Sequence, residues 1–201
     1  MRHIPVLLAL LFVVSPVRAD EFTDDVKRLV TAIGLHAGQT IADIGAGQGQ
    51  LTVALAKEVG ESGRVYSTEM GASRMEGLTR AAADAGLHNV TVLEAHATRT
   101  NLPAGCCDGI VIRFVYHHFA EPTPMNRSLF ESVKPGGHVA VIEFRPRKGG
   151  TVAPDKRADD SSHGVDPDTV VKEMTAAGFE RVAVTDRDNA RGFMVVMRRP
   201  N

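Results

Sequence analysis

Three glycines at alternate positions constrain the fold of this chain more than any other feature of its sequence. Gly45, Gly47 and Gly49 form a glycine loop. An apolar run over residues 40–44 precedes the loop, and a helical pattern over residues 51–59 follows it. Glycine adopts positive φ without strain and lets the backbone approach a ligand closely, while the following helix presents free N–H groups. The pattern predicts a strand, a tight loop and a helix, the opening unit of a parallel sheet.

Strand-like and helix-like segments alternate along the rest of the chain. The β-rich runs span residues 40–44, 64–68, 90–94, 108–115, 138–144, 181–186 and 192–197; the helical patterns span 23–33, 51–59, 73–85, 123–133 and 168–177; and residues 134–137 predict a turn. Alternation implies parallel pairing with helices on both faces, whereas the last two strands, close in sequence, imply an antiparallel hairpin. We therefore predict an α/β fold with a Rossmann-like, doubly wound, seven-stranded sheet, mostly parallel, with an antiparallel C-terminal edge hairpin.

Residues 1–19 have the features of a targeting segment rather than of a folded element. A short positive start precedes an apolar run over residues 6–14, which is too short to span a hydrocarbon core of about 30 Å as a helix. Ala19 ends a small-x-small cleavage site. We expect a signal peptide cleaved after Ala19, export to the periplasm, and a single domain over residues 20–201. An ordinary core helix and an uncleaved anchor are the alternatives.

Composition argues against several functional classes. The 23 Lys and Arg residues nearly balance the 24 Asp and Glu residues, so a net charge of -1 offers no broad footprint for nucleic acid. With no Trp and only two Tyr, the chain lacks a platform for stacking bases. Cys106 and Cys107 are adjacent and form no CxxC metal motif. Neighbouring cysteines rarely form a disulfide with each other. We expect no nucleic-acid partner, no stable membrane span, and a monomer or homodimer.

Two acidic residues end consecutive predicted strands. Asp43 comes two residues before the first glycine, and Glu69 closes the second strand, 24 residues after Gly45. Ligands of open parallel sheets bind at the carboxyl ends of the strands, and an acid in the place of Glu69 accepts hydrogen bonds from ribose hydroxyls. Gln50 stands where the dinucleotide fingerprint has its third glycine. A nicotinamide-dependent oxidoreductase is therefore the weaker interpretation.

The glycine loop and five later segments resemble one protein family. The run from Asp43 to Thr52, DIGAGQGQLT, resembles motif I of the class I S-adenosylmethionine-dependent methyltransferases. Further segments resemble later motifs of that family in the same order: Tyr66–Met70, Leu102-Pro103 with Asp108–Val111, Tyr116–Phe119, Val133–Val141, and His163–Pro167 with Met174–Phe179. The resemblance spans residues 23–197 and is specific for the superfamily, although not for any one substrate.

The resemblance implies methyl transfer from S-adenosyl-L-methionine to a small-molecule acceptor. The cofactor-binding residues that it implies follow the ends of the strands: Asp43, Gly45, Ala46, Gly47, Gly49, Glu69, Met70, His96, Ala97 and Arg113. His96 replaces an Asp that usually accepts a bond from the adenine amino group, and neutral imidazole accepts such a bond less strongly. Arg113 either binds an anionic acceptor or solvates its loop. The alternative function is an exported, non-catalytic binder of S-adenosylmethionine or nucleosides on the same fold.

Tyr116, His117 and His118 follow the fourth predicted strand, where an acceptor would face the methyl group. They are the candidate catalytic residues, because a hydroxyl or thiol acceptor needs help to lose its proton. A histidine here acts as general base, lines the pocket, or belongs to a packing and capping element. The Asn/Asp-Pro-Pro-aromatic run of amine methylases is missing, which disfavours nucleic-acid bases and protein amines as acceptors. We expect no metal, because no sequence spacing ties His163 to His117 and His118.

One long polar segment, residues 145–166, interrupts the alternation of strands and helices. It contains prolines and a pair of glycines and has little apolar surface to bury. Loops of this length in compact domains are usually lids or mobile segments. We expect it to form a mobile lid over the acceptor pocket.

Overall fold

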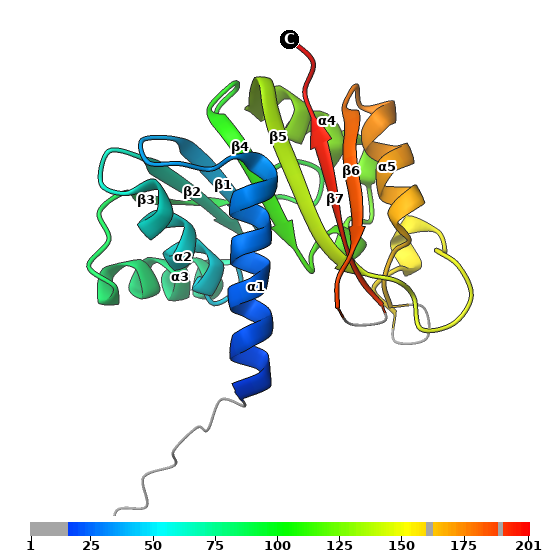
Figure 1. Ribbon diagram of the computed structural model, residues 1–201, viewed down its shortest axis with the longest axis horizontal. Coiled ribbons are helices and arrows are strands. Elements are labelled where there is room, and N and C mark those ends of the chain that lie inside the picture. The colour runs from blue at the N-terminus through cyan, green and yellow to red at the C-terminus, as the bar shows by residue number, and fades with distance from the viewer. Residues whose placement is uncertain (1–15, 160–162, 189–190) are drawn as a thin grey trace, which may run out of the picture.

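A seven-stranded mixed sheet forms the centre of the computed structural model, which describes residues 16–159, 163–188 and 191–201 (Figure 1). The strand order is β3-β2-β1-β4-β5-β7-β6. The strands are β1 Thr40–Ile44, β2 Arg64–Glu69, β3 Val90–Glu94, β4 Cys107–Arg113, β5 Val133–Phe144, β6 Glu180–Asp186 and β7 Gly192–Arg198. Strands β1 to β5 pair in parallel, whereas β7 lies antiparallel between β5 and β6. The predicted fold class, with its antiparallel C-terminal edge, is confirmed.

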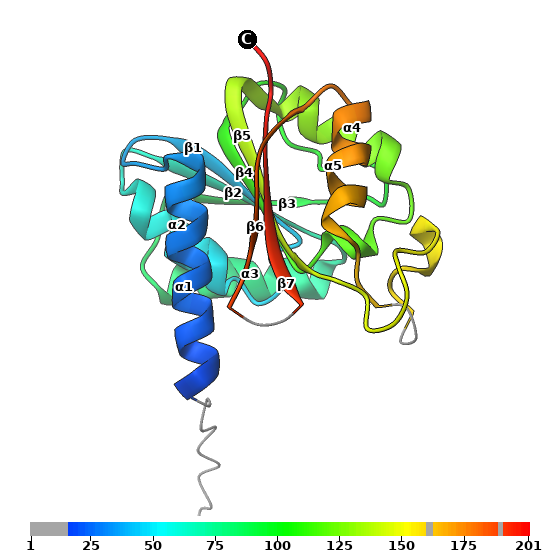
Figure 2. The ribbon, with the colours of Figure 1, turned by 45° about the vertical axis from the view of Figure 1, so that its right-hand side comes forward.

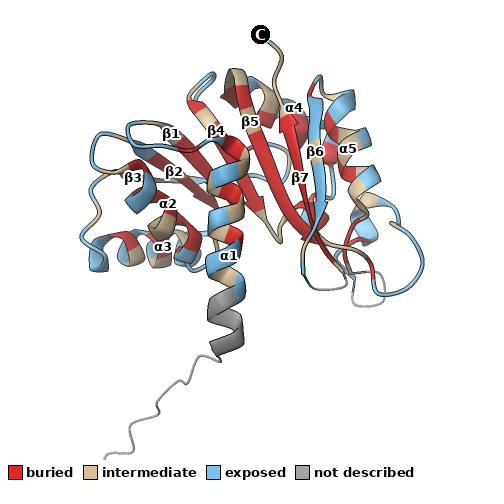
Figure 3. Ribbon diagram, viewed as in Figure 1, coloured by how far each residue is buried: buried red, intermediate tan, exposed pale blue. Residues whose placement is uncertain are grey.

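Helices cover both faces of this sheet (Figure 2). They are α1 Pro16–Ile33, α2 Gln50–Val59, α3 Ala72–Asp84, α4 Pro122–Ser132 and α5 Pro167–Ala176, with short 3-10 turns η1 Tyr116–His118 and η2 Pro154–Lys156. One apolar core lies under α1 and α2, and the other lies under α4 and α5. Along β4, Ile110 and Ile112 point into the second core and Val111 into the first, because strand side chains alternate. The central strands are accordingly buried, and edge strand β6 is mostly exposed (Figure 3).

Strand β5 begins earlier than the sequence predicts. The predicted turn over residues 134–137 is part of β5, and the register between β4 and β5 shifts between Cys107 and Gly109. Gly137 permits the close approach of the two backbones there, because a Cβ atom at this position would lie 2.8 Å from the Asp108 carbonyl oxygen. The turn prediction is therefore wrong, and the Lys-Pro-Gly-Gly run is an irregular stretch within a longer strand.

Cys106 and Cys107 form a disulfide with each other. The expectation that two neighbouring cysteines stay unbridged is wrong for this pair. Cys107 is the first residue of β4, so the disulfide lies at the amino end of the sheet, away from the glycine loop. This position agrees with a structural rather than a nucleophilic role for both residues.

Most of the predicted signal peptide lies outside the described residues, which begin at residue 16. Helix α1 starts there, before the predicted start at residue 23, and continues through the expected cleavage point after Ala19. Within the described part of the chain, no helix is both long enough and apolar enough to cross a membrane.

Candidate functional site

Each glycine of the loop between β1 and α2 meets a different physical requirement. Gly45, Gly47 and Gly49 have φ values of 66°, 56° and 80°, in the region that favours glycine. A Cβ atom at Gly45 would lie 2.7 Å from the Val115 side chain, and one at Gly49 would lie 3.1 Å from Leu78. A Cβ atom at Gly47 would meet nothing within 4 Å. The loop is therefore packed at its two ends and open to a ligand at its middle.

The Glu69 carboxylate lies directly beside this loop. The Gly47 N–H donates to Glu69 Oε2 over 2.8 Å, and the Met70 N–H donates to Oε1 over 2.9 Å. Arg74 approaches Oε1 at 3.4 Å. These contacts hold the buried carboxylate at the carboxyl end of β2, and each of its oxygens retains acceptor capacity for a further donor.

Asp43, at the end of β1, is almost fully buried. Thr52 Oγ1 donates to Asp43 Oδ2 over 2.7 Å, and the same hydroxyl lies 2.7 Å from Ser67 Oγ. Burial raises the pKa of Asp43 to about 6, although the hydrogen bond from Thr52 and the charge of Arg113 oppose the rise. Asp43 is thus a carboxyl group whose charge changes just below neutral pH.

A cleft of about 430 Å³ opens above the carboxyl ends of the parallel strands. Its lining residues come from the glycine loop, from the ends of β1, β2 and β3, and from the chain after β4: Ile44, Gly45, Gly47, Glu69, Met70, Arg74, Ala95, His96, Ala97, Phe114, Val115, His118, Phe119 and Met125. Its volume is within the range of roughly 300–1,000 Å³ typical of small-molecule sites. A larger groove of about 700 Å³, at the amino ends of β2 and β3, contains none of the predicted site residues.

A smaller recess of about 250 Å³ shares Gly45 and Gly47 with the cleft and is also lined by Asp43, Ala46 and Arg113. The structure therefore brings all the predicted cofactor residues except Gly49 to these two adjoining hollows. Gly49 instead faces α3, where an added Cβ atom would come within 3.1 Å of Leu78.

Arg113 connects the end of β4 to helix α1. Its Nε donates to Asp25 Oδ2 over 2.8 Å, and Asp25 also pairs with Arg187 at 2.6 Å. The Arg113 guanidinium lies 4.4 Å from the centre of the Phe114 ring. An arginine paired in this way holds α1 on the sheet. The sequence suggested only an anion-binding role or a loop-solvating role for Arg113.

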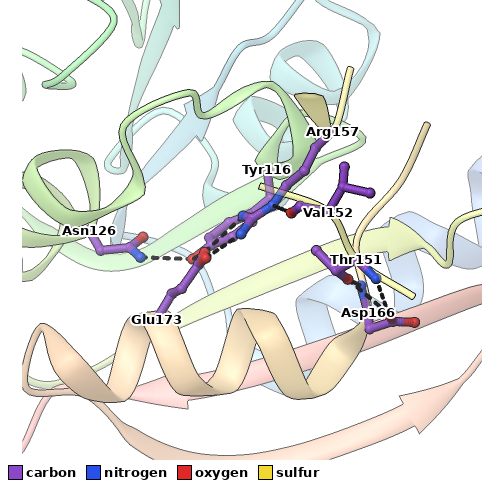
Figure 4. A network of polar contacts seen from close by, with 7 residues as sticks. All are labelled: Tyr116, Asn126, Thr151, Val152, Arg157, Asp166 and Glu173. Atoms are coloured by element: carbon purple, nitrogen blue, oxygen red, sulfur yellow. Dashed lines mark hydrogen bonds and ion pairs between the residues drawn. The ribbon is translucent and has the colours of Figure 1, made fainter. Parts of the chain in front are cut away.

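Tyr116 does not line the cleft, and its hydroxyl points toward Asn126 and Glu173 (Figure 4). Its side chain has no exposed surface, its hydroxyl donates to Glu173 Oε2 over 3.1 Å, and Asn126 Nδ2 donates to the hydroxyl over 2.7 Å. Burial and the nearby Glu173 carboxylate raise the pKa of Tyr116 well above its usual value. The hydroxyl is therefore buried in the core and does not reach the cleft.

The segment expected to form a lid is tied to α5 by one ion pair and is cross-linked within itself by hydrogen bonds (Figure 4). Buried Arg157 pairs with Glu173 of α5 and donates from Nε to the Val152 carbonyl oxygen over 3.2 Å. The Thr151 N–H and hydroxyl donate to Asp166 Oδ2 over 2.7 Å and 2.8 Å. The ion pair attaches the described part of the segment to α5, and the Thr151–Asp166 hydrogen bonds join two parts of the segment to each other.

The structure gathers three histidines beside the cleft. His118 lines the cleft and is exposed, while the ring of buried His117 lies 4.0 Å from that of His118, centre to centre. His163 arrives from the 145–166 segment, with its ring centre 4.5 Å from that of His117. Burial, followed by the neighbouring His117, lowers the pKa of His118. Sequence spacing could not relate His163 to the other two, because the chain brings it back over 45 positions.

Glu143, near the end of β5, is a further polar residue that the sequence interpretation missed. It is fully buried, with Oε1 2.8 Å and Oε2 3.0 Å from His117 Nδ1. A signal was present in the sequence, because Glu143 is the one acid in an otherwise apolar run over residues 139–144. A charged residue is rarely buried in such a strand unless it has a partner.

Comparisons with known proteins place this site in a family. A model of the methyltransferase domain matches residues 41–137. The ubiquinone/menaquinone biosynthesis C-methyltransferase UbiE of Salmonella paratyphi B is 30% identical over an alignment 174 positions long, which covers 74% of this chain and 69% of that relative. This chain belongs to the class I S-adenosylmethionine-dependent methyltransferases. The methyltransferase uses S-adenosyl-L-methionine as methyl donor and is of the type that acts on small molecules.

Solved structures share the fold of this methyltransferase. A methyltransferase from Aquifex aeolicus superposes with a TM-score of 0.74 at 23% identity, covering 92% of this chain and 98% of that one. A possible exported protein from Bordetella parapertussis superposes with a TM-score of 0.70 at 16% identity, covering 91% of this chain and 68% of that one.

Proposed function

We propose that the cleft holds S-adenosyl-L-methionine and presents its methyl group to a small molecule at the end formed by His118, Phe119 and Met125. The observation that carries this proposal is the continuity of the cleft. One hollow connects the open middle of the glycine loop and the Glu69 carboxylate to the His118 ring. The cofactor supplies an electrophilic methyl group, and the protein positions both partners for an in-line displacement.

In this proposal Glu69 accepts hydrogen bonds from the two ribose hydroxyls. The Gly47 and Met70 N–H groups each donate one hydrogen bond to a different oxygen of this carboxylate. A carboxylate oxygen can accept more than one hydrogen bond, so the carboxylate can bind the ribose without losing its contact with the loop. His96 and Ala97, both exposed in the wall of the cleft, are the residues we assign to the adenine ring.

The acceptor end combines an apolar wall with histidine. Phe114, Val115, Phe119 and Met125 supply the apolar surface, and His118 supplies the polar group. This lining suits an acceptor with an apolar body and one proton-bearing nucleophile, such as a hydroxyl. Buried His117 lies behind His118 and supports it rather than lining the cleft.

Calorimetric titration with S-adenosylhomocysteine tests the assignment of the cleft. Glu69→Gln keeps the shape of the side chain but loses its charge, so charge-assisted bonds worth about 1.5–3 kcal/mol are weakened and affinity should fall at least about tenfold. Glu94→Gln is the matched control, because Glu94 ends β3 as Glu69 ends β2, but it lies outside the cleft. Equal affinities of wild type and Glu69→Gln would refute the assignment, and tighter binding of NAD would refute the cofactor specificity.

We also propose that the protein is exported and that its single mature domain begins at Asp20. The short apolar run before Ala19 supports this, as does the structural similarity to a protein described as possibly exported. Cleavage after Ala19 would shorten α1 by its first turn and leave Asp25, its buried ion-pairing residue, in place.

A further inference from the structure

His117, His118 and His163 bring one nitrogen each to within 4.8 Å of the other two. Two of these residues follow β4 as the turn η1, and the third comes from the segment between β5 and α5. The three rings lie beside the cleft, with centre-to-centre distances of 4.0 Å, 4.5 Å and 6.2 Å. A packing cluster of aromatic rings would show similar distances, so the orientation of the nitrogens must distinguish the two arrangements.

The nitrogens of His117 are oriented by Glu143. The Glu143 side chain accepts the backbone N–H groups of His117 and Phe144, each over 3.2 Å, and both of its oxygens face His117 Nδ1. Because carboxyl oxygens accept hydrogen bonds, we assign the ring proton to Nδ1, which donates it to Glu143. Nε2 is left with a lone pair, and it is buried without a hydrogen-bond partner. A buried polar atom without a partner is unfavourable in a packing cluster but is required of a metal ligand.

We propose that His117, His118 and His163 bind a divalent first-row transition-metal ion, with Zn²⁺ as the best match. Three imidazoles and one open position form the ligand set of catalytic zinc sites. A carboxylate that accepts the second N–H of a ligating histidine is the usual supporting contact, and Glu143 provides it as a positioning residue. Nitrogens bound at 2.0–2.1 Å to a tetrahedral ion lie roughly 3.3 Å apart, against at most 4.8 Å here, so binding would draw the three side chains closer together.

A cation at this position would lie at the acceptor end of the cleft, because His118 lines that end. Its open coordination position could bind an acceptor oxygen and make the loss of the oxygen's proton easier. This consequence rests on the proposed function, whereas the metal site itself does not.

Metal titration in the absence of cofactor tests the site. The full chain, without a histidine tag and stripped by a chelator, is titrated with Zn²⁺ in a calorimeter and with Co²⁺ in a visible spectrometer. We expect one ion per chain and the absorption bands of tetrahedral cobalt. His118→Ala and His163→Ala should each weaken Zn²⁺ binding at least tenfold, and Glu143→Gln should weaken it roughly 10- to 100-fold.

His88→Ala is the matched control, because His88 is an exposed histidine outside the cluster, and it should leave Zn²⁺ affinity unchanged. Undiminished affinity in both His118→Ala and His163→Ala would overturn the proposal. The proposal would also be overturned if Co²⁺ added to the wild-type protein kept the spectrum of the hydrated ion. This outcome does not depend on whether any variant folds. Neither result bears on cofactor binding in the cleft, which the titration with S-adenosylhomocysteine measures separately.

Discussion

At the scale of single residues, the pKa of Asp43 links the site to stability. Its pKa is about 6 in the folded protein against an ordinary value of 3.8, because burial disfavours the charged form. The folded state therefore binds this proton more tightly than the unfolded state does. The resulting stabilisation is fully present below pH 3.8 and is lost as the pH rises through 6.

We expect Asp43→Asn to remove this loss of stability, because an amide of the same shape does not ionise. The difference in free energy of unfolding, variant minus wild type, should be larger at pH 7.5 than at pH 4. The increase should be at most about 3 kcal/mol, which corresponds to a shift of roughly two pKa units. Urea unfolding at the two pH values measures the gain. A difference between the two proteins that does not change with pH would show that Asp43 titrates normally.

At the scale of elements, α5 holds the 145–166 segment through one buried ion pair. Arg157 is 3% exposed, and its partner Glu173 also accepts a hydrogen bond from Tyr116. Breaking a buried pair by removing one partner leaves a charge without compensation and costs about 3–5 kcal/mol, less where the remaining charge keeps some contact with water. The Glu173 side chain is 19% exposed, so we expect the low end of that range.

Arg157→Ala should therefore destabilise the protein by about 3 kcal/mol or somewhat less and loosen the segment that carries His163. Hydrogen exchange at the amides of residues 164 and 165, which bond to Arg157 and Phe144, should become faster than in the wild type. Lys148→Ala, at an exposed position on the same segment, is the control and should leave exchange there unchanged. Equal exchange in all three proteins would mean that the ion pair does not hold the segment.

At the scale of the whole molecule, the contacts of α1 bear on the export proposal. Its residues Asp25, Leu29 and Ile33 are buried against the sheet and against Arg113, and all three lie beyond Ala19. We expect a chain that begins at Asp20 to melt at the same temperature as the full chain and to bind S-adenosylhomocysteine with the same affinity.

In a bacterial host with a Sec pathway, N-terminal sequencing of the exported protein should then read from Asp20. A mature protein that still begins at Met1 and sediments with membranes would identify the segment as an anchor. One that begins at Met1 and stays in the cytoplasm would contradict export altogether.

The fold class could be predicted from the sequence alone, and so could the meeting of Asp43, Glu69 and the glycine loop at one edge of the sheet. The bounds of β1 and β3 match their predictions residue for residue, because short β-rich runs between glycines and polar turns are local signals. Asp43, Glu69 and the glycine loop were also predictable, since the carboxyl ends of neighbouring parallel strands must meet. That geometry follows from the alternation of strands and helices without knowledge of any side-chain contact.

The surroundings of His118 could not be predicted from the sequence and follow from tertiary packing. It turned Tyr116 into the core while leaving His118, two residues later, in the wall of the cleft. It also brought His163 and Glu143 to His117 from separate parts of the chain. Contacts between residues so far apart in sequence depend on strand order, on the path of a long loop and on the direction of each side chain. All three are set by packing over the whole molecule, whereas periodicity along the chain indicates only which residues face the same side of one element.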